Sequence, residues 1–377
     1  MASRPSGIGV YGRELIRALS DRSPDTYTAI YPLARWRKRR SLQGTARRAR
    51  PYLSGARLRR KFALVHALDS RLPARYDGPL AATLFDVLSA LPLSAALGLS
   101  TDAFRRKKLR AYDEIARRAR LIVAISRSTR DEFLARFDTA ARVEVVPPGI
   151  DSPPKVEPAE RDTVLRDAGI EPPFVLVVGA LVPRKNIEGC LRAYDASGAG
   201  RNGVRLVVVG EPSFGWEGSA GEKALRTRAA QVVLTGYLPR KTVWAAYARA
   251  AAVLHLAHYE GFGLTVLEAL AAGAPVVASD RGGIPEASGG AAWLVDPNDD
   301  RAAGEALATA IAGGEEVAAR RAKGLEHSQK HRWESTAAQI EELHREILGI
   351  GGTYPTACAP PGSPWEGGAR RKFEDRR

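Results

Sequence analysis

The chain has 377 residues, of which 45% are hydrophobic and 26% are charged, and its formal net charge is +15. This length and composition allow two globular domains, each with its own core. Two distant cysteines, Cys190 and Cys358, argue against a disulfide framework and favour a reducing compartment. No apolar run reaches about 18 residues, and Met1–Gly12 lacks the apolar segment of a signal peptide. We therefore expect a cytoplasmic protein without a transmembrane helix.

The positive charge is concentrated in the first 150 residues, which carry 30 Lys and Arg against 13 Asp and Glu. Segment Arg35–Lys61 alone has twelve basic residues and no acidic one. Such a segment suits either a solvated arginine-rich surface or contact with an anionic membrane surface. Trp36, which has basic neighbours, favours peripheral attachment to the inner face of the cell membrane. Because no reader motif accompanies the charge, we expect no nucleic-acid partner.

Short apolar runs alternate with amphipathic stretches in the first half of the chain, which predicts parallel strands and helices. The expected strands lie near Tyr27–Tyr31, Ala63–His66, Leu80–Phe85, Leu121–Ile125 and Val143–Val146. The expected helices are Val10–Leu19, Asp102–Ala119 and Ser126–Phe137, and Ser126 is a suitable N-cap for the last.

Five prolines between Pro147 and Pro158 argue against both a helix and a sheet interior, so we place an interdomain linker at residues 151–163. The alternation then resumes. Strands are expected at Phe174–Val178, Leu206–Val209, Val232–Leu234, Val253–Leu256, Pro275–Ser279 and Ala292–Val295. Helices are expected at Ile187–Asp195, Lys241–Ala250, Thr265–Ala272 and Arg301–Ala312.

The chain ends with an expected helix at Trp333–Leu348 and a tail, residues 349–377, that is rich in Gly and Pro and is predicted to be disordered. The whole pattern predicts the α/β fold class, with two doubly wound parallel-sheet domains. We place these domains at residues 1–150 and 164–332.

Two adjacent cations, Arg184 and Lys185, follow the expected strand Phe174–Val178 and precede Asn186, which can cap the next helix. In open parallel sheets, ligands bind beyond the carboxyl ends of the strands. Arg184 can form forked hydrogen bonds there and Lys185 can act as a point charge, so the pair can neutralise a pyrophosphate. The same residues also fit an ordinary basic turn before a helix.

A glycine-rich loop joins two carboxylates, Glu260 and Glu268, the second of which lies inside an expected helix. Glycosidase carboxylates lie roughly 5–9.5 Å apart, whereas eight helical residues span about 12 Å. The pair therefore suits the two ends of one ligand, such as a nucleotide sugar, better than the two sides of one bond. Gly261 and Gly263 allow the backbone to approach a sugar or phosphate closely. Two solvent-facing glutamates are the alternative.

Two other groups of polar residues could suggest a metal. Asp296 and Asp299 are better interpreted as a turn followed by a helix cap. His255 and His258 lack further ligands in the local sequence, so packing or substrate contact is expected for them. We expect no metal site.

Several motifs occur in the order found in one enzyme family. Together they resemble the donor-binding half of the retaining family 4 glycosyltransferases, which have the GT-B fold. The resemblance is strong over residues 165–345 and looser over residues 4–150. The motifs are Arg184-Lys185-Asn186, Thr235-Gly236-Tyr237-Leu238, the block from Glu260 to Glu268, the run from Ala271 to Ser279, Gly282-Gly283-Ile284-Pro285-Glu286 and, in the first half, Gly7-Ile8-Gly9, Phe85-Asp86, Ala124-Ile125-Ser126 and the run from Pro147 to Asp151.

The resemblance implies two Rossmann-like domains that face an interdomain cleft, with the helix at residues 333–348 crossing back to the first domain. It also implies roles for single residues. The donor diphosphate is expected to contact Arg184, Lys185, Gly7, Gly9, Gly263 and Leu264, the donor ribose and sugar Glu268, Gly261 and Phe262, and the acceptor Asp86 and His258, with Glu260 as the catalytic residue. No metal or other cofactor is expected, because cations and helix N-termini can stabilise the leaving diphosphate.

Three features depart from the family pattern, one of which is Ala257-His258 and Thr265, where a proline-serine pair and a proline are common. The family usually has an apolar strand before its Gly-x-Gly loop, but only Met1–Ser6 precede Gly7. We therefore expect that the sequence starts too late or that this strand has been lost. The family commonly has a histidine before the position of Asp86, whereas Phe85 stands here and cannot donate a hydrogen bond.

The resemblance implies a retaining enzyme that moves a hexose, with mannose as the first candidate, from a nucleotide-diphosphate sugar such as GDP-mannose. The expected acceptor is a lipid-linked or saccharide molecule of surface polysaccharide, lipopolysaccharide or cell-wall biosynthesis. The alternative is a non-catalytic protein of the same fold that binds a sugar nucleotide or a lipid.

Overall fold

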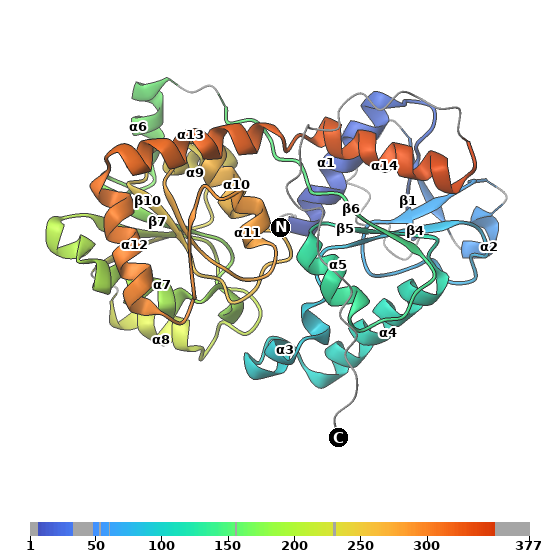
Figure 1. Ribbon diagram of the computed structural model, residues 1–377, viewed down its shortest axis with the longest axis horizontal. Coiled ribbons are helices and arrows are strands. Elements are labelled where there is room, and N and C mark those ends of the chain that lie inside the picture. The colour runs from blue at the N-terminus through green and yellow to red at the C-terminus, as the bar shows by residue number, and fades with distance from the viewer. Residues whose placement is uncertain are drawn as a thin grey trace, which may run out of the picture.

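The computed structural model describes residues 7–32, 48–52, 54–59, 61–154, 157–228 and 231–350. Its strands form two large parallel sheets, which lie in two halves of the molecule placed side by side in Figure 1. We call residues 7–150 the N-terminal half and residues 158–329 the C-terminal half. This is the α/β architecture that the alternating sequence pattern predicts.

The N-terminal half contains a four-stranded parallel sheet in the order β3-β4-β5-β6 and a separate parallel pair, β1 with β2. Every residue of β4 and β5 is buried, in accord with the continuous apolar sequences of these strands. The strands are β1 (Ala29–Pro32), β2 (Ala49–Tyr52), β3 (Val65–Ala67), β4 (Leu80–Leu84), β5 (Leu121–Ala124) and β6 (Arg142–Val145). The helices are α1 (Gly7–Arg22), α2 (Gly55–Leu58), α3 (Pro92–Ala96), α4 (Asp102–Arg118) and α5 (Arg127–Leu134).

The C-terminal half contains a six-stranded parallel sheet in the order β12-β11-β10-β7-β8-β9. Its strands are β7 (Phe174–Val178), β8 (Arg205–Val209), β9 (Val232–Gly236), β10 (Ala252–His255), β11 (Val276–Ser279) and β12 (Trp293–Val295). Its helices are α6 (Pro158–Asp167), α7 (Ile187–Ser197), α8 (Ala220–Thr227), α9 (Arg240–Arg249), α10 (Leu264–Ala271), α11 (Ile284–Ser288), α12 (Asp300–Ala312) and α13 (Glu315–Gln329).

Both faces of this sheet are covered by helices, and the alternation along β7 shows how. Phe174 and Leu176 pack in the core that includes α9 and α10. Val175 and Val177 point to the opposite face and pack with α7 and α12. A strand buried on both faces needs an unbroken apolar sequence, so β7 was predictable with its correct bounds.

The last helix, α14 (Trp333–Ile347), packs against α1, so the C-terminal end of the described chain completes the N-terminal half. Figure 1 shows α13 lying over the left-hand half and α14 lying beside α1 in the right-hand half. Apolar side chains of both helices join one core, including Tyr11 and Leu15 from α1 and Ala337 and Ile340 from α14.

A buried polar chain also ties α14 to the N-terminal half. The ring of His344 contacts the Tyr27 hydroxyl at 3.3 Å and the ring of His66 at 2.9 Å, and His66 contacts the Thr83 hydroxyl at 2.9 Å. Burial lowers the pKa of His344 to about 4, although the carboxylate of Glu341 opposes this shift. Burial and the proximity of His344 lower the pKa of His66 as well. Both rings are therefore neutral near pH 7.

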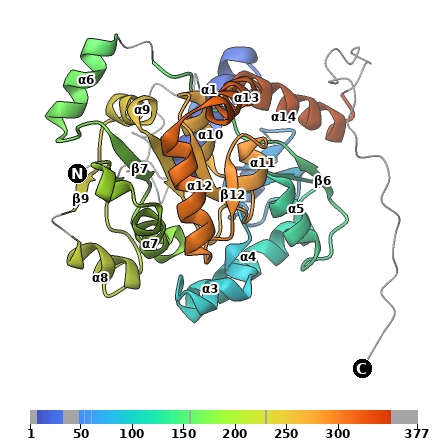
Figure 2. The same ribbon diagram turned by 60° about the vertical axis from the view of Figure 1, so that its left-hand side comes forward.

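The expectation that no helix includes Pro158 is wrong, because α6 begins at that residue. Proline is tolerated there since the first turn of a helix leaves its N–H groups without intrahelical partners. α6 packs against α9 and its Glu160 pairs with Lys241, so residues 158–163 belong to the C-terminal half rather than to a free linker. Figure 2 shows α6 beside α9.

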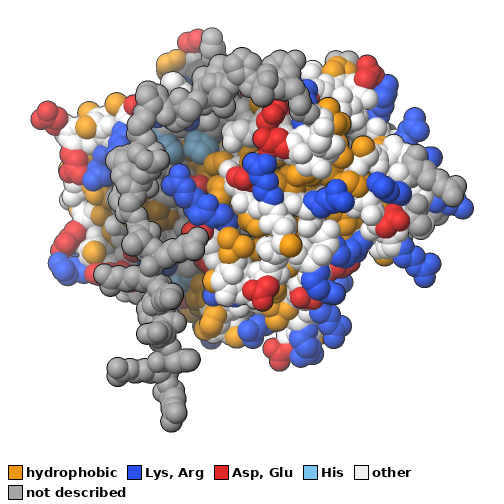
Figure 3. Space-filling model, turned by 45° about the vertical axis from the view of Figure 1, so that its right-hand side comes forward, with side chains coloured by type: hydrophobic (Ala, Val, Ile, Leu, Met, Phe, Trp, Pro, Cys, Tyr) orange, Lys and Arg blue, Asp and Glu red, His pale blue; other side chains and the backbone are white. Residues whose placement is uncertain are grey.

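Three further predictions differ from the structure or lie partly outside the described residues. α1 begins at Gly7, so Gly7 and Gly9 lie in the first turn of a helix and not in a loop. The basic segment Arg35–Lys61 includes β2 and α2, but Trp36 lies outside the described residues, as does the expected tail beyond residue 350. Figure 3 shows Lys and Arg side chains spread over the face that includes the N-terminal half. Among the helices of the described ranges, none is long and apolar enough to cross a membrane.

Candidate functional site at the switch point of the C-terminal sheet

The strand order of the C-terminal sheet reverses between its central strands, β7 and β10. The chain continues from β7 toward β8 and β9 on one side, and from β10 toward β11 and β12 on the other. Such a switch point leaves a crevice at the carboxyl ends of the strands, where ligands of open α/β sheets bind. Arg184 and Lys185 follow β7, and Glu260 follows β10. The fold thus brings these predicted site residues to one place.

The turn that holds the two cations is fixed by Asn186. This residue adopts a left-handed conformation, with a φ of 53°, which asparagine tolerates better than most side chains. Its Oδ1 accepts the N–H of Gly189 at 3.1 Å, which caps α7, and its Nδ2 donates to the Pro297 carbonyl at 2.9 Å. The predicted cap is therefore present, and it holds the preceding residues in a single turn of 3₁₀-helix, Pro183–Lys185.

Arg184, Lys185 and Glu260 form one ion cluster. Oε1 of Glu260 lies 2.6 Å from a guanidinium nitrogen of Arg184 and 2.6 Å from Nζ of Lys185. Burial alone would raise the pKa of Glu260, but the two cations outweigh this effect and lower it. Burial lowers the pKa of Lys185, and Glu260 opposes that shift. The cluster is a doubly cationic site that one carboxylate neutralises in part.

Glycines let the loop around Glu260 pack tightly against its neighbours. A Cβ on Gly282 would lie 2.2 Å from the Glu260 carbonyl oxygen, and one on Gly283 would lie 2.4 Å from that of Gly261. A Cβ on Gly261 would lie 1.8 Å from the carbonyl oxygen of Phe85, which belongs to the N-terminal half. Side chains at these positions would push the loop away from both halves. The glycine pair of the sequence motif is thus required by close backbone approach.

Gly263 caps the N-terminus of α10 in a left-handed conformation, with a φ of 115°. Leu264 is the first residue of this helix, whose opening N–H groups are suited to an anion. The side chain of Phe262 is buried in the hydrophobic core and packs against His331, with ring centroids 5.6 Å apart. Of the predicted donor contacts in this loop, Phe262 can therefore offer only its backbone.

Glu268, on the second turn of α10, has a different partner from Glu260. Its Oε1 accepts a hydrogen bond from Arg240 at 3.0 Å, and Arg240 also pairs with Asp151 at 3.0 Å. Burial raises the pKa of Glu268, while Arg240 opposes the shift. The two glutamates are thus paired with different cations.

Arg240 was missed in the sequence analysis. It stands at the first position of α9, where a cation faces the positive end of the helix dipole. A cation in that unfavourable position is a local signal that a carboxylate partner lies nearby, and the structure supplies Glu268.

The N-terminal half contacts the Glu260 loop through α5. The hydroxyls of Ser126 and Thr129 donate to the Gly261 carbonyl at 2.6 and 3.3 Å. The Tyr259 hydroxyl donates to Glu132 of α5 at 2.6 Å. Ser126 also caps α5 as predicted, since its hydroxyl accepts the N–H of Thr129 at 3.0 Å. Ser126 therefore both caps α5 in the N-terminal half and binds the backbone of the C-terminal half.

A second contact across the halves involves Glu286, whose carboxylate accepts the backbone N–H of Arg127 at 2.9 Å. Arg127 is the first residue of α5, so a side chain of the C-terminal half satisfies a free N–H at a helix end of the N-terminal half. These contacts hold the two halves together next to the ion cluster.

The two residues expected on the acceptor side lie in different places. Asp86 lies against the Glu260 loop, because a Cβ added to Gly261 would be 3.4 Å from the Cβ of Asp86. The negative charges of Glu260 and, to a lesser extent, Asp86 raise the pKa of Arg184. His258 is half-buried, and the charged groups that act on its pKa all belong to the C-terminal half. Burial is the main cause of its lowered pKa. Asp86 thus lies at the contact between the two halves, whereas the charged groups around His258 belong to the C-terminal half.

Asp296 and Asp299 form the predicted turn and cap. Asp296 accepts the N–H of Asn298 at 2.9 Å, and Asp299 accepts the N–H of Ala302 at the start of α12 at 2.9 Å. In the described part of the chain, no three His, Cys, Asp or Glu side chains are grouped as a metal site would need.

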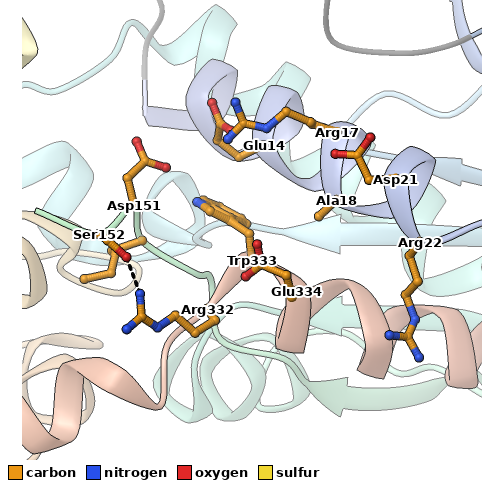
Figure 4. Close-up of a pocket in the computed structure, with 11 residues that line it drawn as sticks. Glu14, Arg17, Ala18, Asp21, Arg22, Asp151, Ser152, Arg332, Trp333 and Glu334 are labelled. Atoms are coloured by element: carbon orange, nitrogen blue, oxygen red, sulfur yellow. Dashed lines mark hydrogen bonds and ion pairs between the residues drawn. The ribbon is translucent and has the colours of Figure 1, made fainter. Parts of the chain in front are cut away.

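A cavity of about 570 Å³ lies between α1, the start of α14 and the residues that follow β6 (Figure 4). Arg332 and Ser152 form a hydrogen bond at one side of it, and the ring of Trp333 lies between α1 and the segment that holds Asp151 and Ser152. None of the predicted site residues lines this cavity. It touches the site indirectly, through Asp151, which lines it and pairs with Arg240.

Comparison with known proteins identifies the family. The model of the family described as Glycosyltransferase Family 4 matches residues 5–152, and the model of the family described as Glycosyl transferases group 1 matches residues 161–327. The chain belongs to the family 4 glycosyltransferases. The second match includes Arg184, Lys185 and Glu260 of the ion cluster, and the first includes α5, which contacts the Glu260 loop.

Two curated relatives of this chain are mannosyltransferases. O-antigen chain mannosyltransferase B of Escherichia coli is 30% identical over 233 residues, which are 60% of this chain and 61% of the relative. The GDP-mannose-dependent alpha-(1-6)-phosphatidylinositol monomannoside mannosyltransferase of Mycobacterium tuberculosis is 28% identical over 243 residues, again 60% and 61%. The chain thus spans about three fifths of the length of these relatives.

Solved structures share the fold of this chain over most of its length. HepE from Anabaena, in complex with UDP-glucose, has a TM-score of 0.71 at 20% identity and covers 92% of this chain and 98% of its own. Sucrose-phosphate synthase from Thermosynechococcus elongatus has a TM-score of 0.66 at 20% identity, with 92% and 94% covered. The predicted GT-B fold of two Rossmann-like domains is confirmed.

Proposed function

We propose that this chain transfers a hexose from a nucleotide-diphosphate sugar to an acceptor, with retention of the anomeric configuration. The observation that supports this best is the ion cluster at the switch point, where Arg184 and Lys185 share the single carboxylate of Glu260. A donor diphosphate would replace Glu260 as the counter-ion of the two cations. Glu268, at the other end of the loop and helix, would accept hydrogen bonds from the ribose hydroxyls.

In the proposed reaction, the acceptor hydroxyl oxygen bonds to the anomeric carbon as the bond from that carbon to the diphosphate oxygen breaks. The diphosphate leaves with the electron pair and takes the acceptor proton on the same face of the sugar. Arg184, Lys185 and the first N–H groups of α10 stabilise the charge that develops on the leaving group. The exposed first turn of α1, with Gly7 and Gly9, approaches the phosphates from the other half. This route needs no metal or other cofactor.

The donor to test first is GDP-mannose, because the two curated relatives named above are mannosyltransferases and one is GDP-mannose-dependent. UDP-glucose is the second, since HepE was solved with it. The acceptor we propose is a lipid-linked or saccharide molecule of surface polysaccharide or cell-wall assembly. The O-antigen and phosphatidylinositol mannoside substrates in the names of the relatives support this class.

We test the donor site by calorimetric binding of GDP-mannose and UDP-glucose to the parent, Lys185→Ala and Glu268→Ala. Each variant removes a hydrogen bond to a charged group, worth about 1.5–3 kcal/mol, so binding should weaken roughly 10- to 100-fold. Lys330→Ala and Glu326→Ala, which remove an exposed ion pair of α13, serve as matched controls. Parent-like binding by both site variants would show that the site has been placed wrongly.

The alternative function, binding without catalysis, rests on Phe85. Its ring packs edge-on against Tyr11 at 4.9 Å and offers no hydrogen bond where the family commonly has a histidine. The calorimetric experiment distinguishes the two functions when it is paired with a turnover assay. Donor binding without release of nucleoside diphosphate over a set of lipid-linked and saccharide acceptors would favour the alternative.

We also propose that the enzyme works at the inner face of the cell membrane, as a peripheral protein attached to anionic lipid. The described structure supports this at α3 and α4 more directly than at the basic segment Arg35–Lys61. No charged residue occurs between residues 87 and 101, and α4 then brings five cations within Arg105–Arg110. Phe104, Arg106, Lys107 and Arg110 are exposed.

A further inference from the structure

β10 ends in a histidine at a position where the rest of the strand is apolar. Ala252, Val253 and Leu254 are fully buried, and the side chain of His255 is only 3% exposed. Its Nε2 has no hydrogen-bond partner among the described residues. A buried polar group without a partner destabilises a fold by about 1–3 kcal/mol. The ring therefore occupies a place in which leucine would be the more stabilising residue.

The ion cluster lies close to this nitrogen. Nε2 of His255 lies 3.9 Å from Oε1 of Glu260, which is too far for a hydrogen bond. That oxygen is already bound at 2.6 Å by each of Arg184 and Lys185. His255 thus lies next to a carboxylate whose attachment to the cations competes with the proposed donor.

A diphosphate cannot take both cations while Glu260 keeps them, because the negative charges would then lie together in a buried site. Glu260 must give up at least part of its contact with Arg184 and Lys185. Once released, the carboxylate needs another donor, since an unpaired buried carboxylate is costly. A shift of about 1 Å toward His255 would give a hydrogen bond of ordinary length.

We infer that His255 is a positioning residue which receives the Glu260 carboxylate when a diphosphate takes over Arg184 and Lys185. Glu260 then has two positions, one on the cations in the empty site and one on the Nε2–H of His255 in the loaded site. The inference rests on the proposed function, in which these cations bind the donor diphosphate. It adds a residue that neither the sequence motifs nor the cation pair includes.

The charge of the imidazole suits this role. Burial and the nearby Lys185 lower the pKa of His255 to about 3, with Glu260 opposing and Arg184 reinforcing the shift. The ring is therefore neutral near pH 7 and can donate one hydrogen bond. A permanent third cation would hold Glu260 against His255 at all times, whereas a neutral donor lets the carboxylate move between two positions.

The test compares His255→Leu, which fills the space without a donor, with His255→Gln, whose amide nitrogen can reach Glu260. His327→Leu is the matched control, because His327 is also a histidine with a buried Nε2 that lacks a partner among the described residues, but it lies on α13. We expect His255→Leu to keep or raise the thermal midpoint and to weaken GDP-mannose binding about tenfold. His255→Gln should restore most of the loss, and His327→Leu should bind like the parent.

A second measurement does not depend on sugar transfer. The imidazole ¹⁵N and ring N–H resonances of His255, assigned by comparison with His255→Gln, are followed by NMR during titration with inorganic pyrophosphate, GDP and UDP. Formation of the new hydrogen bond should move the ring N–H signal downfield in the parent, and the shift should disappear in Glu260→Ala. A structural histidine would show no shift that depends on Glu260.

The outcomes separate the two hypotheses. If His255→Leu binds within twofold of the parent, or if saturating diphosphate leaves the His255 resonances unchanged, the inference is overturned while the donor site stands. If pyrophosphate moves the resonances but no sugar nucleotide binds, the movement of Glu260 is supported and the proposed function fails.

Discussion

At the scale of single residues, Gly261 decides how closely the two halves can approach. A Cβ at this position would lie 1.8 Å from the carbonyl oxygen of Phe85 and 3.4 Å from the Cβ of Asp86. We predict that Gly261→Ala leaves each core intact but separates the halves by about an ångström, with a loss of roughly 100-fold in kcat/KM. Steady-state kinetics and thermal unfolding check this. Gly12→Ala is the control, because no atom lies within 4 Å of its added Cβ, and activity in Gly261→Ala that equals this control would contradict the prediction.

At the scale of elements, α3 and α4 form a surface that suits a bilayer. Figures 1 and 2 both show these helices at the lower edge of the molecule. Phe104 is 49% exposed at the start of α4, and Arg106 and Lys107 are exposed beside it. Apolar side chains flanked by cations are the arrangement found in helices that lie at anionic lipid interfaces.

We predict that the protein floats with vesicles of phosphatidylcholine and phosphatidylglycerol at low salt, and much less with phosphatidylcholine alone. Each Lys or Arg near such a surface contributes about 1 kcal/mol, so Arg106→Gln with Lys107→Gln should weaken binding about 30-fold. Arg301→Gln, on the exposed face of α12, is the matched control. Binding that survives the double substitution would assign the membrane contact to another surface, and no flotation at low salt would remove the membrane proposal.

At the scale of the whole molecule, the two histidines between α14 and the N-terminal half couple stability to pH. The pKa of His344 is about 4, below the ordinary value of 6.5, and that of His66 is also lowered. A histidine whose pKa is lowered on folding binds more protons when unfolded. Its stabilisation is complete above pH 6.5 and is lost as the pH falls toward 4.

We predict that the free energy of unfolding falls by about 3 kcal/mol between pH 7 and pH 4 on account of His344, at 1.36 kcal/mol per pKa unit. Urea unfolding at several pH values measures this slope. His344→Gln should flatten it without abolishing it, because His66 titrates in the same direction. Hydrogen bonds from Ser23 and Arg22 also lower the pKa of Glu341 against the opposing effect of burial, so its stabilisation is lost as well when the pH falls. An unchanged slope in His344→Gln would show that protonation of other groups causes the loss of stability at low pH.

Much of the fold could be predicted from the sequence, because burial leaves a periodic apolar pattern. β7 was predicted with its correct bounds, and Ser126 and Asn186 were correctly identified as caps. α13 was missed since only Val317, Gly324 and Ser328 of this helix are buried, so it carries no apolar stripe. Helices of this kind are positioned by their neighbours rather than by their own periodicity.

The site was predictable where its residues form local motifs and not where distant residues meet. The family resemblance assigned Arg184, Lys185 and Glu260 to one donor site, and in the structure both cations lie 2.6 Å from the Glu260 carboxylate. It could not find the contact between Arg127 and Glu286, which are 159 positions apart. Pairings of this kind depend on how the two halves pack, and no local spacing encodes that packing.

The packing of α14 on α1 has a consequence for how the protein is made. Apolar side chains of α1 pack against Trp333 and the residues after it, which are synthesised about 310 residues after α1. At roughly 5–20 residues per second this interval lasts about 15–60 s. Throughout synthesis the C-terminal half can close around its own sheet, whereas the half made first keeps an open apolar seam until nearly the whole described chain has emerged. We therefore expect the N-terminal half, which is made first, to be completed after the C-terminal half.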